Sequence, residues 1–235
     1  LFVYIRIQIA GKRTVCCPAW NAQFEGETLL FFGNNFNEHF AEPGTIVLDS
    51  ATLRLLFNPT SVAVIGADDQ ETHPGNIVMR NLLGGKFLGP VMPVHEEKMP
   101  ICDVESYRSV DTLPLTPDLA VICSPPASIP EYILELGKRG TRAAVILSQG
   151  FFRSQTELET AQIRAIKMAT REYGIRILGP NCLGYINPHI GLNASLAHCD
   201  ALPGKVAFVS QSDSLFTSVL DWASSKGIGF SYSIS

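Results

Sequence analysis

The sequence predicts an α/β fold built on a doubly wound parallel sheet, followed by the start of a second α/β unit. Short apolar runs without polar interruption recur from residue 50 onward, which is typical of parallel strands covered by helices on both faces. Amphipathic segments separate these runs, and several of them end at a glycine. A stretch rich in Gly and Pro, residues 179–204, then precedes a renewed strand–helix pattern.

The first unit contains five predicted strands and three predicted helices. The strands are expected at 61–65, 91–94, 119–123, 143–147 and 175–178, and the helices at 76–83, 129–139 and about 155–173. In the longest helix, Ser154 and Glu157 have capping-box spacing, and Gly174 occupies the position of a left-handed C-cap residue. Alternation of strands and helices implies right-handed crossovers between parallel strands.

The same patterns predict four segments along the chain. Residues 1–46 lack regular patterning and are expected to be a leader that is poorly ordered or outside the fold. Residues 47–180 form the first domain, and residues 181–204 form a connector. The second domain begins at 205, with a strand at 205–209, a helix at about 213–226 and another strand near Gly229. Both ends of the chain are interpreted as edges of a fragment.

Composition excludes several classes of protein. Of 235 residues, 46% are hydrophobic and 17% are charged, a balance that supports a buried core and argues against disorder. The net charge of −4 and the lack of a basic stripe argue against nucleic acid as a partner. The apolar runs are far shorter than the ~20 residues that span a bilayer. Six scattered cysteines without a CxxC pair favour a reduced chain, so we expect a soluble, cytoplasmic protein.

Ligands of open parallel sheets bind beyond the carboxyl ends of the strands, where the strand order reverses. After the first predicted strand comes Gly66-Ala67-Asp68-Asp69, and Gly75 and Asn76 open the next helix. The two glycines would let the backbone approach a phosphate, and the helix N-terminus would offer it free N–H groups. A plain strand-to-helix turn is an equal alternative, because no GxGxxG is present and both aspartates would repel a phosphate.

The ends of later strands provide further candidates, each with a structural alternative. A shelf for an adenine ring or a pantetheine arm could form at Ser124-Pro125-Pro126, which could equally be a simple loop. At Gln149-Gly150, the glycine could also let the backbone come close to a ligand. In the string from Gly179 to Gly184, Asn181 and Cys182 could face one ligand, although a buried structural cysteine is commoner.

Two other features give weaker indications. The turn Ser210-Gln211-Ser212 before a helix could bind an anion, or Ser212 could be an ordinary N-cap. The five histidines show no metal-ligand spacing, so neither His189 nor His198 is predicted to be a ligand or a base. No Gly-x-Ser-x-Gly nucleophile elbow is present.

Several strings occur in an order that resembles a known family. They are the sequences at 56–59, 61–67, 79–83, 117–122, 178–184, 191–194, 209–212 and 220–223. Together they resemble the CoA-binding region of the NDP-forming acyl-CoA synthetase superfamily, which includes relatives of the succinyl-CoA synthetase alpha subunit. The resemblance covers about residues 50–235 and implies a Rossmann-like CoA-binding domain, followed by the start of a flavodoxin-like domain that the chain does not complete.

The resemblance also implies a ligand, CoA or acetyl-CoA, and a set of binding residues. The CoA phosphates would lie at Gly66, Ala67, Gly75 and Asn76, with Lys98 as the nearest candidate for a phosphate-binding lysine. The nucleotide and pantetheine path would be lined by Val94, Ser124, Pro125 and Pro126. The thiol end would lie near Gln149, Gly150, Asn181 and Cys182.

Two kinds of parent protein fit this resemblance. Asp213 stands where ADP-forming ligases of the family usually have glycine, and its charge disfavours a phosphate at the helix N-terminus. The main interpretation is therefore the acyl-CoA-sensing region of a bacterial protein lysine acetyltransferase, and the alternative is the CoA-binding portion of an ADP-forming acetate–CoA ligase. We expect ATP-grasp and acetyltransferase domains in the parent chain and no catalysis by this chain alone, and we leave a homo-oligomer open.

A third interpretation belongs to another class, an NAD(P)-binding oxidoreductase domain. It is disfavoured because no acidic residue directly ends the second predicted strand to bind a ribose hydroxyl. The nearest is Glu96, two residues beyond Val94.

Overall fold

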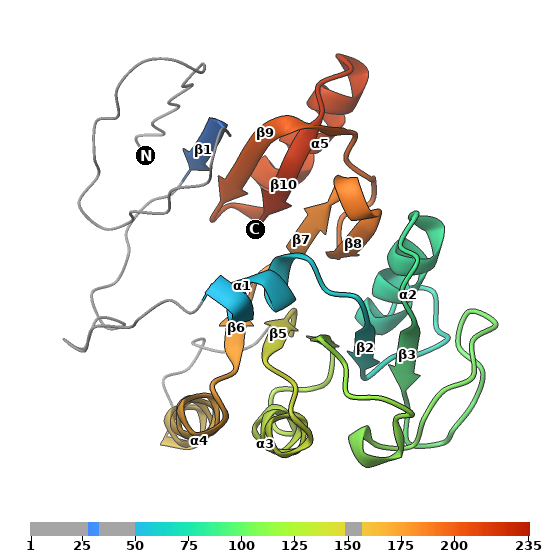
Figure 1. Ribbon diagram of the computed structural model, residues 1–235, viewed down its shortest axis with the longest axis vertical. Coiled ribbons are helices and arrows are strands. Elements are labelled where there is room, and N and C mark those ends of the chain that lie inside the picture. Colours follow the sequence, from blue (N-terminus) through green and yellow to red (C-terminus); the bar gives the residue numbers. More distant parts are fainter. Residues whose placement is uncertain (1–27, 33–49, 149–156) are drawn as a thin grey trace.

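The computed structural model describes residues 28–32, 50–148 and 157–235, which form two five-stranded sheets (Figure 1). The first sheet is parallel throughout, in the order β3-β2-β4-β5-β6. Its strands are β2 (Val62–Ile65), β3 (Val91–Val94), β4 (Leu119–Ile122), β5 (Ala143–Ile146) and β6 (Arg176–Leu178). The predicted α/β fold with a doubly wound, Rossmann-like parallel sheet is confirmed, and each strand bound lies within one residue of its prediction.

The two faces of this sheet are both buried, because alternate residues of each strand point to opposite sides. Val62 and Val64 pack into a core that includes residues of α1 (Ser50–Phe57) and α2 (Pro74–Gly84). Ala63 and Ile65 pack into the opposite core with α3 (Ile129–Arg139) and α4 (Glu157–Tyr173), which lie side by side on that face (Figure 1). The uninterrupted apolar runs follow from this double coverage. Helix α1 was not predicted.

The second sheet is mixed, in the order β1-β9-β10-β7-β8. Strand β9 (Pro203–Ser210) pairs in parallel with β1 (Thr28–Phe32) and with β10 (Phe230–Ile234). Strand β10 is antiparallel to β7 (Gly184–Asn187), which pairs with β8 (Leu192–Ser195). Helix α5 (Asp213–Ser225) contributes Phe216 and Leu220 to a core around Phe208.

The segment 181–204, expected to be a connector, contains the β7–β8 hairpin. The short 3₁₀ helix η3 (Pro188–Ile190) makes its turn, and Gly191 follows with a φ of +66°. Tyr185 is fully buried in the core of the first unit, whereas its neighbour Ile186 is buried in the core of the second. The hairpin therefore packs into both units instead of only linking them, although its glycines and prolines are typical of a loop.

The leader also differs in part from its prediction. Residues 28–32, which were expected outside the fold, form β1 along β9. The rest of the leader lies outside the described residues. Within the residues that the structure describes, no helix is both long and apolar enough to cross a membrane.

Candidate functional site

The order of the first sheet reverses between β2 and β4, which makes the carboxyl ends of these strands its switch point. Gly66 follows β2 with a φ of +73°, a conformation that favours glycine. A Cβ at this position would lie 2.5 Å from the Ser124 hydroxyl oxygen and 2.9 Å from the Ser124 backbone nitrogen. The loops after β2 and β4 therefore touch here, and two of the predicted site residues, Gly66 and Ser124, are neighbours.

Gly75 brings the start of α2 against the same loop. A Cβ on Gly75 would lie 2.2 Å from the Gly66 carbonyl oxygen and 2.8 Å from the Cα of Ala67. The position that a Cβ of residue 75 would take is thus occupied by backbone atoms of Gly66 and Ala67. Both glycines allow the strand, the loop and the helix to pack closely, and a ligand would contact the outer side of this turn.

The N-terminus of α2 is capped by a side chain of the chain itself. The His73 Nδ1 accepts a hydrogen bond from the Gly75 N–H at 3.1 Å, and the His73 carbonyl accepts one from the Asn76 N–H at 2.9 Å. Pro74 at the first helical position has no N–H to offer. The N–H groups of Gly75 and Asn76, expected to face a phosphate, are therefore already engaged.

Asn76 is only 3% exposed and fastens the loop to the helix. Its side-chain nitrogen donates to the Asp68 carbonyl at 3.1 Å and contacts the Cys102 sulfur at 3.7 Å. Its Oδ1 is buried and has no hydrogen-bond partner among the described residues. Asn76 thus stabilises the turn, and its Oδ1 stays available as an acceptor.

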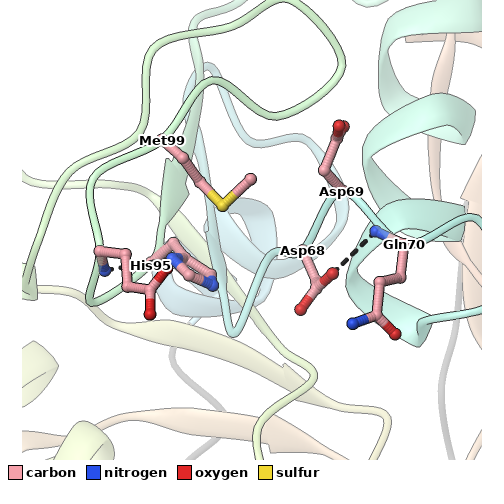
Figure 2. A pocket seen from close by; sticks show the side chains of 6 residues that line it. Asp68, Asp69, Gln70, His95 and Met99 are labelled. Carbon is pink, nitrogen blue, oxygen red and sulfur yellow. Dashed lines mark hydrogen bonds between the residues drawn. The ribbon is translucent and has the colours of Figure 1, made fainter.

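A pocket of about 470 Å³ opens beside this turn, between the loops after β2 and β3 (Figure 2). The Asp68 carboxylate accepts the Gln70 N–H at 2.7 Å, and the Asp69 carboxylate accepts the Cys102 N–H at 3.2 Å. Figure 2 shows His95 and Met99 across the pocket from the two aspartates. Because its lining is acidic, the pocket disfavours a phosphate and suits a neutral or cationic group. It is lined by Asp68, Asp69, Gln70, His95, Glu97 and Met99.

The remaining candidates along β3 and β4 lie at the same edge but differ in accessibility. Val94 pairs with Ile65 and is 3% exposed, so its side chain belongs to the core. Ser124 is buried, and its carbonyl accepts the Ser148 hydroxyl from the end of β5. Pro125 is exposed and Pro126 is half-buried, so this Pro-Pro turn offers an apolar surface to a ligand. Lys98 lies in an exposed turn with a φ of +47°.

Asn181 and Cys182 lie farther along the edge, beyond the ends of β5 and β6. The Cys182 thiol contacts the Ile146 carbonyl at 3.5 Å, and Asn181 is exposed with a φ of +63°. Burial, with a smaller contribution from the Asp213 carboxylate, raises the pKa of Cys182 to about 12. The thiol is therefore protonated near neutral pH and is a poor nucleophile. Gln149 and Gly150 lie outside the described residues.

The first turn of α5 approaches this second group of residues. The Ser212 hydroxyl accepts the Leu215 N–H at 3.3 Å, so Ser212 is an N-cap. Asp213 follows it and accepts a hydrogen bond from the Ser235 hydroxyl at 2.9 Å. A carboxylate at this position stabilises the helix but opposes a second negative charge there.

Some site residues had not been singled out from the sequence. His73 caps α2. Its position immediately before Pro74, a residue favoured at the first position of a helix, could have indicated this role in the sequence. Tyr132 lies on α3, and burial together with the Glu96 carboxylate raises its pKa. Ser148 binds the Ser124 carbonyl across neighbouring strands, a contact that only the sheet register creates.

A glycine-lined switch point between parallel strands defines an α/β domain of the nucleotide-binding class. The sequence model of the family described as "CoA binding domain" matches residues 60–188, more than half of the chain. This chain therefore belongs to the CoA-binding domain family. A second family model, "Succinyl-CoA ligase like flavodoxin domain", matches residues 203–235.

Curated relatives and solved structures agree with this assignment. An acetate–CoA ligase [ADP-forming] I of Archaeoglobus fulgidus is 38% identical over 180 residues, which cover 77% of this chain and 26% of that protein. The alpha subunit of an acetate–CoA ligase [ADP-forming] I of Pyrococcus furiosus is 35% identical, with 78% of this chain and 40% of the subunit covered. The chain thus spans between about a quarter and two fifths of these relatives.

The dinucleotide forming acetyl-coenzyme A synthetase 1 of Ca. Korarchaeum cryptofilum, solved with phosphate and ADP, superimposes with a TM-score of 0.72. It is 33% identical, and the match covers 78% of this chain and 39% of that chain. The predicted CoA-binding, succinyl-CoA ligase-like character is confirmed. The reported relatives are named as ADP-forming ligases, so they favour the alternative interpretation over a lysine acetyltransferase parent.

Proposed function

We propose that this chain binds CoA or acyl-CoA as the CoA-binding part of an ADP-forming acyl-CoA ligase. The observation that carries the proposal is the match of the CoA-binding family over the whole first sheet, including the turn where Gly66, Gly75 and Ser124 meet. The names of the relatives support the ligase, and the wider family supports CoA as the ligand.

The ligand would lie along the carboxyl edge of the first sheet. From β3 to β6 this edge spans four strand spacings of ~4.8 Å, or about 19 Å. An extended ligand could therefore contact the acidic pocket at one end and the Asn181-Cys182 turn at the other. Between them, the exposed face of Pro125 and Pro126 would support its apolar arm.

Electrostatics favour a direction for the ligand. The carboxylates of Asp68 and Asp69 line the pocket, where they could accept hydrogen bonds from an adenine amino group but would repel a phosphate. The phosphates would then lie outside the pocket, toward Gln70 and His73, and the thiol toward Asn181 and Cys182. We propose that an ATP-grasp domain of the parent ligase supplies the nucleotide chemistry.

The experiment is isothermal titration of the chain with CoA, acetyl-CoA, NAD and ADP. We expect micromolar binding of CoA and acetyl-CoA and no binding of NAD. Gln70→Glu places a new charge at the rim of the pocket, beside the proposed phosphates, and should weaken CoA at least fivefold, which is ~1 kcal/mol. Gln162→Glu makes the same change on α4, on the face of the first sheet covered by α3 and α4, and should leave CoA affinity unchanged.

Two results would overturn the proposal. Binding of NAD without CoA would assign the sheet to another dinucleotide. If Gln70→Glu and Gln162→Glu lowered the CoA affinity equally, the effect would come from the net charge of the molecule. The binding site would then not lie at the β2–β3 edge.

A further inference from the structure

A group of three metal-ligating side chains lies in the second unit, on elements other than the CoA-binding sheet. His198 and Cys199 belong to the loop between β8 and β9, and Asp221 lies on α5. The His198 Nε2 is 2.9 Å from an Asp221 carboxylate oxygen. One ligand atom from each of the three residues lies within 4.8 Å of the other two.

The backbone around this cluster is held by the fold. The Ser195 hydroxyl accepts the Ala197 N–H at 3.1 Å, and the Asn193 side chain donates to Asp200 at 2.6 Å, so the loop is fastened on both sides of His198 and Cys199. Asp221 follows Leu220, which is buried in the second core. The backbone that carries the three donors is therefore fixed, which lowers the entropy lost when they bind one ion.

The cluster is also open to an ion from solvent. The side chains of His198 and Asp221 are 60% and 58% exposed, and Cys199 is partly buried. The two exposed side chains can rotate without disturbing a core. Imidazole nitrogen, thiolate sulfur and carboxylate oxygen together suit Zn²⁺, whereas Mg²⁺ and Ca²⁺ prefer oxygen ligands alone.

We propose that His198 Nε2, Cys199 Sγ and Asp221 Oδ1 bind a zinc ion in tetrahedral geometry, with water as the fourth ligand. Zinc–ligand bonds of about 2.0–2.3 Å place the ligand atoms of a tetrahedron roughly 3.3–3.8 Å apart, within the 4.8 Å spread of the cluster. The imidazole and the carboxylate must separate by several tenths of an ångström. The zinc ion replaces the thiol proton of Cys199, which leaves to solvent.

Asp200 is not a member of the group of ligand atoms that lie within 4.8 Å of one another. Its carboxylate accepts a hydrogen bond from the Asn193 side chain at 2.6 Å. The fourth position is consequently open to water or to an exchangeable ligand, as in zinc sites with three protein ligands. The ion would join the β8–β9 loop to α5.

The test uses the full chain with Cys16→Ser and Cys17→Ser, because this vicinal pair could itself bind metal. Co²⁺ is titrated as a spectroscopic substitute, and Zn²⁺ affinity is measured by chelator competition. We expect one equivalent of Co²⁺ with the visible bands of a tetrahedral site and a thiolate-to-metal charge-transfer band. Cys199→Ser should abolish the charge-transfer band, and His198→Gln should weaken Zn²⁺ at least tenfold.

His189→Gln is the matched control, since His189 is also an exposed histidine of the second unit and contacts the Gly204 carbonyl at 2.8 Å. It should leave both the spectrum and the Zn²⁺ affinity unchanged. Zn²⁺ should also raise the melting temperature of the chain with Cys16→Ser and Cys17→Ser, but not that of the same chain with Cys199→Ser added. The proposal is overturned if the chain with only Cys16→Ser and Cys17→Ser shows no thiolate-to-metal band with Co²⁺, or if the band persists after Cys199→Ser is added. It is also overturned if His189→Gln lowers the Zn²⁺ affinity as much as His198→Gln does.

Discussion

The two sheets of this chain differ in how completely their strands are covered. Every residue of β2, β4 and β5 is buried, because helices lie on both faces of the first sheet. Along β9 of the second sheet, by contrast, Pro203 and Lys205 are exposed, whereas Ala207 and Phe208 are buried. The first sheet thus lies between two cores. The second sheet has one core of its own, with α5 against it, and its β7–β8 hairpin also reaches into a core of the first unit.

The β7–β8 hairpin shows what this difference means for stability. Its strand β7 belongs to the second sheet, yet Tyr185 lies in the first core and its hydroxyl donates to the Leu56 carbonyl. The Asn81 side chain on α2 donates to the carbonyls of Ser195 and Ala197, at 2.8 and 2.9 Å. The less covered sheet is therefore attached to the more covered one through buried contacts.

The largest effect is expected when this attachment is cut at Tyr185. Tyr185→Ala should lower the free energy of unfolding by about 3–5 kcal/mol, because it empties a fully buried ring site and leaves the Leu56 carbonyl without its donor. Tyr232→Ala is the matched change: both rings contact Phe57, at centroid distances of 5.6 and 5.7 Å, but Tyr232 is half-buried. It should cost roughly 1–2 kcal/mol.

Guanidinium unfolding, followed by circular dichroism and by Trp222 fluorescence in a Trp20→Phe background, measures both costs. Trp222 lies on α5 and reports on the second unit. In Tyr185→Ala, the fluorescence transition should precede the loss of helix signal. Equal costs for the two tyrosines would contradict the inference that the hairpin joins the two units.

The same contrast explains what the sequence could predict of the fold. Strands β2 to β6 were predicted within one residue, because two-sided burial forces uninterrupted apolar runs. The hairpin was missed, since β7 and β8 are short and Gly184, Pro188 and Gly191 around them are typical of loops. Helix α1 was missed because eight residues carry little periodicity.

The next prediction compares one valine from each sheet. Val121 in β4 is fully buried, and Val209 in β9 is half-buried. Val121→Ala should cost about 2–3 kcal/mol, because methyl groups are lost from a site that cannot refill, and Val209→Ala about 1 kcal/mol. Urea unfolding of both variants measures the difference. Similar costs would mean that the second sheet is as closely covered as the first.

The candidate site was less predictable than the fold, because its contacts join residues that lie far apart in the sequence. Gly66, Gly75 and Ser124 were identified because strand ends and glycines are visible in the sequence. Their role in packing the turn depends on contacts between the loop after β2, the start of α2 and the loop after β4. The approach of Asp213 to Cys182, and of His198 to Asp221, joins residues more than 20 positions apart on different elements. Residue spacing along the sequence therefore does not predict that these pairs lie close together.

The last prediction concerns a buried thiol of the first unit and the pH dependence of stability. Cys123 follows β4, and burial raises its pKa from 9.0 to about 12. Because the folded-state pKa is the raised one, the full stability is present below pH 9 and is lost as the pH rises from 9 toward 12. The loss should approach 1.4 kcal/mol per pH unit. The measurement is the free energy of unfolding between pH 8 and pH 10.

In Cys123→Ala, the loss of unfolding free energy between pH 8 and pH 10 should be smaller by about 1.4 kcal/mol, whatever the effect of the substitution on stability at pH 7. Cys102→Ala is the control, because the Cys102 thiol is only partly buried and water screens its charge. In the described part of the second unit the one thiol, Cys199, is only partly buried. An alkaline loss that Cys123→Ala leaves unchanged would contradict this prediction. Any part that remains is expected from Cys182 and Cys199, because burial also raises their pKa values, to about 12 and about 11.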